Sequence, residues 1–494
     1  MSGQSIINFL GKNTKQYDLI AIDFIDDVFL KDHKKTENLV ELVYKNISEE
    51  GSIWLTCNNF LDVEHDRFIP FRLQKLFTKN NFYLKNIICW VSENSNNEYF
   101  NDYYKLILFF TKNEKKFFFN KDLVREKHIW KDVEWGKRKF RYNEKGKDPG
   151  NVWLPTEDDG KAKITKHCIL STKEKNDRIF NLSTSANTRS ALFTYESYKH
   201  KNLTDIIIYK KDIIKKYNSI KKNSFLKNNT VLNKNFSHKI IFKNSVNIDN
   251  IKEKSVKLVI TSPPYWDLKD YDNKNQIGRG ESYKNYIENL TNVWKKCISI
   301  LSDDGSIWIN VNTRNIKGKF YNIANDICDS LNKLNVINFE TIIWHKSSGI
   351  PVGQKNFSDR FEYILGFKKD NNKNINLYDD IGSDYLFDEN KQNLNIWNMN
   401  RPSGSISKGV PHPAMYPIEL PRRIIRRFSD TSDIILDPFL GSGSTTAASI
   451  LENRNSFGYE LNKDYKKIIS LQIEKAIKET KSAHRLSHEV NYSS

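Results

Sequence analysis

Short apolar runs alternate with helical patterns along the chain. Residues 19–22 and 52–56 are apolar enough for buried strands, and residues 36–46 between them have the apolar spacing of an amphipathic helix. In the second half, the apolar run 433–436 precedes a glycine-containing turn and then residues 447–451, which favour a helix. Because buried strands that alternate with helices are typical of α/β folds, the sequence predicts an α/β protein.

The same succession of patterns occurs twice. Residues 48–54 read Ser-Glu-Glu-Gly-Ser-Ile-Trp, residues 302–308 read Ser-Asp-Asp-Gly-Ser-Ile-Trp, and similar apolar runs follow both. An offset of 245 (424 − 179) also places Ile179 opposite Ile424. Two copies of one domain explain these matches, and a chance likeness between two α/β folds is the alternative.

The predicted copies are separated by a polar segment. Residues 210–236 are rich in Lys and Asn with few apolar positions, which is typical of a linker. We therefore assign residues 1–209 to the first copy, residues 237–480 to the second and residues 481–494 to a tail. The apolar run 238–242 is expected to open the second copy as an edge strand.

The glycine-containing turn is the first candidate for chemistry. Gly441 and Gly443 lack Cβ atoms, so the backbone can turn tightly between the strand and the helix and a ligand can approach it closely. No Lys follows these glycines, which argues against a phosphate-binding P-loop. The next apolar run ends at Glu460, an acceptor suited to ribose hydroxyls. A tight corner without a ligand is the alternative.

A double-proline motif follows the apolar strand 256–260. Pro263 and Pro264 fix φ twice and remove two backbone donors, which leaves rigid carbonyl acceptors. Ser262 adds a hydroxyl before them and Tyr265 an aromatic ring after them. Acceptors for an amine beside a stacking ring suit a nucleobase extruded from a duplex. A Pro-rich turn that only closes a strand is the alternative.

Together these motifs resemble those of DNA methyltransferases that methylate exocyclic amines. Residues 262–265 resemble the family's (Ser/Asp)-Pro-Pro-(Tyr/Phe) catalytic motif, and residues 437–443 resemble its Asp-Pro-Phe-x-Gly-x-Gly cofactor motif. Residues 412–417 resemble the His-Pro-x-x-(Phe/Tyr)-Pro segment that lines the methionine end of the cofactor. The order of the motifs is that of the family's β group. The resemblance implies a Rossmann-like sheet with helices on both faces, and S-adenosylmethionine as methyl donor.

The resemblance also assigns roles to residues. Ser262 and the Pro263 carbonyl would orient the target amine, and Pro264 and Tyr265 complete the catalytic set, with Tyr265 stacking on the base. It places the cofactor against Asp437, Phe439, Gly441, Gly443, Ser444, Thr445, Glu460, Tyr416 and Pro417. Two questions stay open: Ser444 and Thr445 either bind the cofactor carboxylate or cap a helix, and Asp437 either touches the ligand or holds the loop.

The expected substrate is double-stranded DNA. Within the family, Ser at the first catalytic position favours the N4 amine of cytosine, and the N6 amine of adenine is the alternative. By analogy the chain would be the modification component of a restriction–modification system with a cognate endonuclease. A non-catalytic DNA-binding protein is a rival of another class, which the intact motifs disfavour. A bifunctional restriction enzyme is a third possibility, although no nuclease carboxylate cluster is evident.

The first copy lacks these motifs. Residues 23–26 read Asp-Phe-Ile-Asp where the second copy has Ser-Pro-Pro-Tyr, and the 245 offset places its cofactor loop at 192–201, which holds no glycine. We interpret it as a degenerate copy that forms an internal pseudo-dimer within a monomer, with a homodimer as the alternative. The basic residues and aromatic rings of 115–147 would suit DNA, or would form a solvated basic face.

Composition agrees with a nucleic-acid partner. The formal net charge of the 494 residues is +18, which favours polyanions. Five cysteines without a Cys-x-x-Cys pair argue for a reducing compartment and against a zinc site, so no metal is expected. None of the cysteines follows a proline, so the nucleophile of ring-carbon cytosine methylation is missing. No apolar run is long enough to span a bilayer, and we expect a cytoplasmic protein with no membrane contact.

Overall fold

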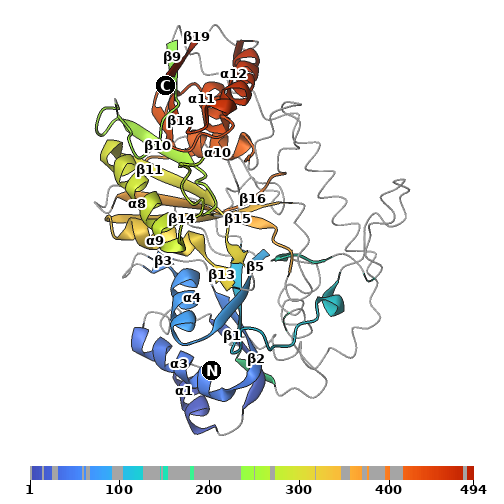
Figure 1. Cartoon of the computed structure of the whole chain (residues 1–494). Coiled ribbons are helices and arrows are strands. Elements are labelled where there is room, and N and C mark those ends of the chain that lie inside the picture. The colour runs from blue at the N-terminus through green and yellow to red at the C-terminus, as the bar shows by residue number, and fades with distance from the viewer. Residues whose placement is uncertain are drawn as a thin grey trace.

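The chain forms two mixed β-sheets in the computed structural model (Figure 1). The structure describes residues 3–13, 16–24, 32–57, 61–62, 67–91, 104–125, 145, 148–153, 168, 179–182, 235–249, 251–266, 273–316, 319–346, 357–369, 375–377, 395–400, 415–481 and 487–493. Within these ranges a six-stranded sheet belongs to the first half of the chain and a nine-stranded sheet to the second. None of the helices in these ranges is long and apolar enough to cross a membrane.

The first half places its described α-helices on one face of its sheet. Its elements are α1 (Gly3–Lys12), β1 (Tyr17–Phe24), α3 (His33–Asn46), β2 (Ile47–Cys57), β3 (Leu61–Asp62), β4 (Arg67–Phe68), α4 (Ile69–Lys79), β5 (Tyr83–Val91), β6 (Tyr104–Thr111), η1 (Lys121–Val124), β7 (Val152–Trp153) and β8 (Ile179–Leu182). Successive strand residues face opposite sides, so Ile53 of β2 packs in one core with Leu39 of α3. Trp54 faces the other side, where it belongs to a second cluster with Phe119 and Phe357.

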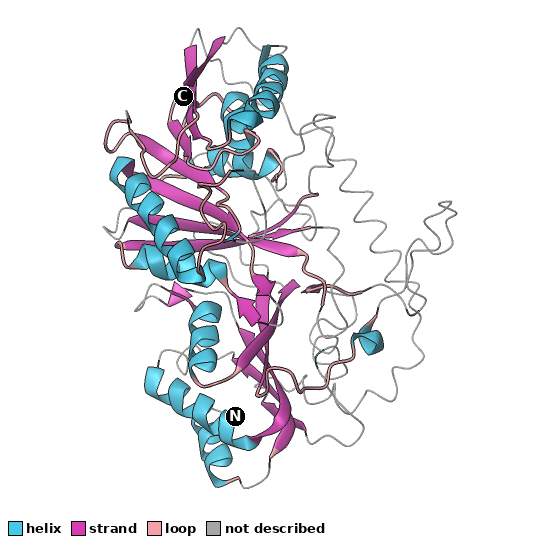
Figure 2. Cartoon of the chain, in the orientation of Figure 1, coloured by secondary structure: helices cyan, strands magenta, loops and turns pink. Residues whose placement is uncertain are grey.

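The second half has helices on both faces (Figure 2). Its elements are β9 (Asn235–Ile241), β10 (Val256–Thr261), α8 (Tyr283–Ile300), β11 (Leu301–Val311), β12 (Arg314–Ile316), β13 (Lys319–Tyr321), α9 (Ile323–Asn332), β14 (Val336–His345), β15 (Phe361–Lys369), β16 (Ile396–Asn398), α10 (Glu419–Phe428), β17 (Ile434–Asp437), α11 (Ser444–Leu451), β18 (Asn455–Tyr459), η5 (Lys463–Tyr465), α12 (Lys466–Lys481) and β19 (Ser487–Ser493). Ile307 of β11 packs with α8 and α9, whereas Trp308 packs with α10. The predicted α/β class is confirmed.

The strand order confirms the internal duplication. The first sheet runs β7-β5-β6-β2-β1-β8, and six strands of the second run β16-β14-β15-β11-β10-β17. Each pair of neighbours has the same direction in both sheets. The irregularities in strand pairing also match. The register of β5 shifts between Leu84 and Asn86, and that of its counterpart β14 shifts at the equivalent place, between Asn338 and Glu340. In the second half, β18, β9 and β19 extend the sheet further.

The predicted offset of 245 is wrong at the end of the first copy. Leu19 pairs with Ser52 and Leu258 with Ser306, so Leu19 and Leu258 are equivalent positions. Their partners on the other side are Ile179 and Ile435, which gives an offset of 256 (435 − 179). Ile179 is therefore a strand residue and does not correspond to Ile424 of α10, because the ungapped comparison ignored a difference in length between the copies.

This correction moves the degenerate cofactor loop. Its expected position is directly after β8 instead of 192–201, and both stretches lie outside the described residues. The sequence has no glycine between Gly160 and Gly278, so the expected loop of the first copy lacks glycine in either register. Residues 126–144 of the basic and aromatic segment and 210–234 of the linker also lie outside the described residues, and the domain boundaries stay a prediction.

The strand β9 is not at the edge of the sheet. It pairs with β18 on one side and with β19 on the other, both in parallel. The residues that form β19 were assigned to a tail, because their polar composition hides the strand pattern. His238 of β9 contacts His488 of β19 and Ser456 of β18, at 3.1 and 2.9 Å between side-chain atoms. The end of the chain's described part therefore completes the second sheet.

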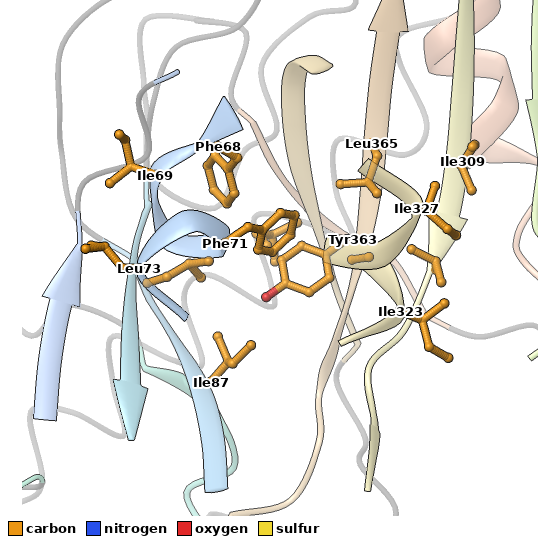
Figure 3. Close-up of a cluster of buried hydrophobic side chains, with 14 of the residues drawn as sticks. Phe68, Ile69, Phe71, Leu73, Ile87, Ile309, Ile323, Ile327, Tyr363 and Leu365 are labelled. Carbon is orange, nitrogen blue, oxygen red and sulfur yellow. The ribbon is translucent and has the colours of Figure 1, made fainter. Parts of the chain in front are cut away.

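The two halves share a buried apolar cluster (Figure 3). Phe71 of α4 meets Tyr363 of β15 edge-on, with ring centroids 5.4 Å apart. Figure 3 shows Phe68 and Ile87 on the side of the first half, facing Ile327 of α9 on the other. Because this cluster is continuous with the cores under α3 and α8, the halves pack as one body along it.

Candidate active site

Both sequence motifs open into one pocket of the second half. Strands β10 and β17 are parallel neighbours, so the residues that follow them lie at the same edge of the sheet. The pocket encloses about 810 Å³ of empty space, its open mouth included. Its lining is Lys243, Asn244, Ser245, Ser262, Pro264, Asn273, Asn275, Gln276, Ile277, Met415, Tyr416, Pro438, Phe439, Leu440, Gly441, Ser442, Tyr459, Glu460, Leu461, Asn462 and Tyr465.

The glycine turn has the backbone that was predicted from its composition. Gly441 and Gly443 have φ of 55° and 91°, which L side chains rarely adopt. A Cβ on Gly443 would also lie 3.3 Å from the Ile469 side chain of α12. Helix α11 begins directly after this turn, and Gln472 of α12 donates to the Ser442 carbonyl at 2.9 Å. The turn is thus fixed between two helices, with Gly441 on the pocket side.

Asp437 holds the loop together and does not line the pocket. One carboxylate oxygen accepts from the Thr261 hydroxyl at 2.6 Å and from the Phe439 N–H at 3.0 Å. The other accepts from the hydroxyls of Thr445 at 2.6 Å and Tyr416 at 3.0 Å. Burial raises the pKa of Asp437 above its usual value, and these hydrogen bonds oppose that shift. One carboxylate therefore joins the ends of β10 and β17, helix α11 and the segment before α10.

Ser444 and Thr445 have their hydroxyls turned into the protein. Ser444 donates to the Tyr416 carbonyl at 3.1 Å, and Thr445 bonds Asp437 and the Tyr416 hydroxyl. Neither lines the pocket, and α11 has Gly443 at its N-cap with no side-chain cap. Through these hydrogen bonds, Ser444 and Thr445 fix the start of α11 to Tyr416. Pro417 lies at the turn into α10, where its carbonyl accepts from Leu420 at 3.0 Å.

Glu460 lines the pocket at the end of β18. Its two carboxylate oxygens accept the N–H groups of Gly441 at 2.7 Å and Asn462 at 2.8 Å. Only 9% of the residue is exposed, and burial raises its pKa to about 7. Each oxygen keeps a further lone pair, so the side chain can hold the glycine turn and still accept from a ligand hydroxyl.

The double-proline corner presents Ser262 and Pro264 to the same pocket. The Pro264 carbonyl accepts from the Tyr286 hydroxyl of α8 at 2.8 Å, which anchors the corner to the helix. Tyr265 lies behind Ser262 and is buried, with its hydroxyl bonded to Glu362 at 2.7 Å. Of the predicted catalytic residues, Pro263 and Tyr265 are absent from the lining. Trp266, which follows, has φ of 34° and stacks edge-on against Tyr283 and Tyr321.

Sequence reasoning missed two groups of residues. The first lines the pocket from the loop after β9 and consists of Lys243, Asn244 and Ser245. The second is a buried polar group behind Ser262, made of Asn310, Lys346 and Glu362. The signal for this second group was a single carboxylate inside the apolar strand 361–367.

Comparison with known proteins identifies the family of the chain. The family model for DNA methylases, N6_N4_Mtase, matches residues 27–251 and 256–471. The type II methyltransferase M.MjaI of Methanocaldococcus jannaschii is 32% identical over 276 residues, which is 48% of this chain and 91% of the relative. M.MthZI of Methanothermobacter thermautotrophicus is 30% identical over 49% of this chain and 78% of its own length.

A solved structure with a similar fold is the PvuII DNA methyltransferase, which is described as cytosine-N4-specific. It is 17% identical over 51% of this chain and 96% of its own, with a TM-score of 0.40. The family model matches both copies of the domain, and both motifs of the second copy meet in one pocket. The chain therefore belongs to the N6/N4 family of DNA methylases.

Proposed function

We propose that the second half transfers a methyl group from S-adenosylmethionine to the exocyclic amine of a base in double-stranded DNA. The observation that carries this proposal is the shared pocket, into which the glycine turn and the double-proline corner both open. Transfer between two bound molecules requires reacting atoms about 3 Å apart, so both binding corners must face one space.

The cofactor would occupy the side of the pocket lined by Phe439, Gly441 and Glu460. Glu460 accepts ribose hydroxyls in this proposal, and the close backbone at Gly441 lets the ligand approach. Tyr416 and its neighbour Met415 also line the pocket. Asp437, Ser444 and Thr445 act through the loop that they fix. Bound S-adenosylmethionine would supply an electrophilic methyl group on its sulfonium centre.

The target base would lie against Ser262 and Pro264. An exocyclic amine is a poor nucleophile because its lone pair is conjugated with the ring. A hydrogen bond from the amine to the Ser262 oxygen orients the nitrogen lone pair toward the donor. Extruding a base costs roughly a few kcal/mol, which contacts in the pocket must offset. The chain itself forms no covalent bond to the base in this scheme.

We further propose cytosine N4 as the target, because Ser262 stands where adenine N6 enzymes usually have Asp. Duplex DNA is incubated with the chain and methyl-labelled cofactor, digested to nucleosides and analysed by mass spectrometry. We expect N4-methyldeoxycytidine, whereas N6-methyldeoxyadenosine would identify adenine as the target instead.

Two variants control this experiment. Ser262→Ala should lower methylation at least tenfold, while Asp23→Ala, at the equivalent position of the first copy, should leave it unchanged. An unmethylated product from the unaltered chain would refute the proposed function. The type II names of the relatives support a role in protecting DNA from a cognate endonuclease. Resistance of DNA from expressing cells to that endonuclease would test this role.

We also propose that the first half serves as the internal partner of the second. Helices α4 and α9 begin at equivalent positions, Ile69 and Ile323, with an offset of 254 (323 − 69). The same offset relates Lys75 to Asp329 (329 − 75), and these two residues form an ion pair across the interface. The halves thus meet through the same elements, as subunits of a two-fold dimer do.

The charges of Lys75 and Asp329 favour the pairing of a first half with a second half over the pairing of two identical halves. Two catalytic halves would place Asp329 against Asp329, and two first halves would place Lys75 against Lys75. The chain should therefore sediment as a monomer at micromolar concentration. Lys75→Asp should lower the thermal midpoint, and the added Asp329→Lys should recover most of the loss. An obligate homodimer, or no recovery in the double variant, would remove the internal-partner proposal.

A further inference from the structure

The polar group behind Ser262 gives its hydroxyl a fixed direction. We propose that a relay from Lys346 through Glu362 and Tyr265 holds the Ser262 proton inward, so that its oxygen faces the pocket only as an acceptor. The relay rests on the proposed function, because it concerns how that site recognises an amine. It makes Glu362, Lys346 and Asn310 positioning residues, and Tyr265 the link to Ser262.

The relay begins with a buried ion pair. Lys346, which follows β14 and is 1% exposed, donates to one oxygen of Glu362 at 2.9 Å. Burial raises the pKa of Glu362, but the Lys346 charge and the hydrogen bonds outweigh burial and keep that pKa below its usual value. Glu362 is thus a carboxylate at neutral pH, and a carboxylate can only accept hydrogen bonds.

Tyr265 must then point its proton at Glu362. Its hydroxyl lies 2.7 Å from the second Glu362 oxygen. A tyrosine hydroxyl has a single proton, so toward any other neighbour the Tyr265 oxygen can only accept. Ser262 lies 3.2 Å from that oxygen and therefore donates to it. The one proton of Ser262 is used there, which leaves the lone pairs of its oxygen for the pocket that it lines.

Asn310 of β11 reinforces the same direction. Its amide nitrogen lies 2.8 Å from Glu362 and 3.2 Å from the Tyr265 hydroxyl, and it is 3.5 Å from Ser262. Because the Glu362 oxygen can only accept, the Asn310 atom beside it must be the nitrogen. Its two hydrogens serve Glu362 and Tyr265. The Asn310 amide therefore occupies an acceptor position of Tyr265 without competing for the tyrosine proton.

This direction has a consequence for specificity. A base amine donates hydrogen bonds and matches an acceptor, whereas the carbonyl at the same ring position of thymine only accepts. An Asp at the position of Ser262 would be an acceptor by its charge alone. A serine can donate or accept, so it discriminates amine from carbonyl only when its proton is held elsewhere, which is the task of the relay.

The first copy lacks the relay together with the motif. The register of its sheet places Lys105 at the position of Glu362 and Thr56 at the position of Asn310. Lys105 lies over the Trp90 ring, 5.7 Å from its centroid. A cation there cannot accept from a tyrosine hydroxyl. Within one chain, the carboxylate and the catalytic serine are therefore present together or absent together.

The first test removes the link and keeps the ring. Tyr265→Phe deletes the hydroxyl through which Ser262 is directed, and we expect kcat to fall at least tenfold while the cofactor Kd stays within twofold. Tyr363→Phe is the matched control, since it deletes a neighbouring buried hydroxyl outside the relay. That control should leave kcat unchanged. Equal kcat in Tyr265→Phe and the unaltered chain would overturn the relay.

The second test asks whether the relay acts through Ser262. Glu362→Gln can donate to Tyr265 and reverse the direction, so kcat should fall at least tenfold. In a Ser262→Asp background the acceptor is fixed by charge, and the same Glu362→Gln change should alter kcat less than threefold. An equal fall in both backgrounds would show a merely structural role and overturn the relay.

The tests also separate the relay from the proposed function. A chain that methylates no DNA would overturn the proposed function and the relay with it. A chain that methylates DNA with Tyr265→Phe as active as the unaltered protein would overturn the relay alone. Thermal midpoints of all variants report whether each folds. If Glu362→Gln unfolds because Lys346 loses its counter-charge, Tyr265→Phe and its control decide the matter.

Discussion

Three buried carboxylates of the second half have different roles because their hydrogen-bond partners differ. Asp437 accepts only from the protein and fixes the loop, Glu362 is paired with Lys346, and Glu460 faces the pocket. The same chemical group thus supplies support, direction and ligand binding. Neutralising each one should have a different signature in cofactor binding, catalysis and stability.

Glu460 gives a pH-dependent prediction. Its raised pKa of about 7 means that the free protein takes up a proton as the pH falls through 7, and a protonated acid is a poorer acceptor for ribose hydroxyls. We expect the cofactor Kd to rise below pH 7, by at most about tenfold per pH unit. The measurement is calorimetry from pH 8 to pH 6.

Glu460→Gln is the control for this titration. Its amide does not ionise, so the ratio of the two Kd values isolates Glu460 from protons that the ligand itself binds. We expect that ratio to favour the unaltered protein at pH 8 and to shrink toward pH 6. A ratio that does not change with pH would show that Glu460 does not ionise in this range.

At the scale of single residues, the sequence predicted the features that depend on local backbone conformation. The positive φ at Gly441 and Gly443 follows from the glycine pattern, and the corner at Ser262 follows from the two prolines. The relay could not be predicted in this way, since Tyr265 and Glu362 are 97 residues apart and Asn310 and Glu362 are 52 apart. Their contact exists only because β10, β11 and β15 are neighbours.

At the scale of elements, the interface between the halves is built like a core. Phe71 is 3% exposed and packs edge-on against both Phe68 and Tyr363. Helix α4 therefore packs against both sheets, and the loss of the Phe71 ring affects the packing of both. The periodicity of α4 predicts one apolar face, but it does not predict which surface covers that face.

Phe71→Ala tests how far the halves depend on each other. Truncating a buried Phe costs about 3–5 kcal/mol through lost burial and the cavity that is left. We expect a lower thermal midpoint and a single shifted transition by calorimetry. Leu123→Ala, at a residue that is 54% exposed, should change the midpoint little. Two separated transitions in Phe71→Ala, one of them unshifted, would show that the halves unfold independently.

Strand order could be predicted only in part from the sequence. The repeated Gly-Ser-Ile-Trp strands 51–54 and 305–308 indicated the duplication, and the sheets confirm it. The register of β8 was missed because a gap of 11 residues (256 − 245) cannot be seen without the pairing of β1 and β10. The strand β19 was missed because its alternate residues are exposed and polar.

At the scale of the molecule, the sequence carries both motifs in the second half alone. The first half has neither proline of the catalytic motif, and no glycine occurs between Gly160 and Gly278. We expect calorimetry to find one S-adenosylmethionine bound per chain, and Gly441→Asp to abolish that binding. A stoichiometry of two would mean that the first half keeps a working cofactor site. The net charge of +18 favours a polyanionic partner such as DNA.

The pairing of β9 also sets an order of events on the ribosome. Ser237 of β9 bonds Asn455, which is 218 residues later, and β19 is made later still. All described strands of the first sheet precede β9 in the chain and are therefore synthesised before it. The first sheet can therefore fold while the second is still being translated. Helix α4 then provides a folded surface against which α9 and β15 can pack once they are synthesised.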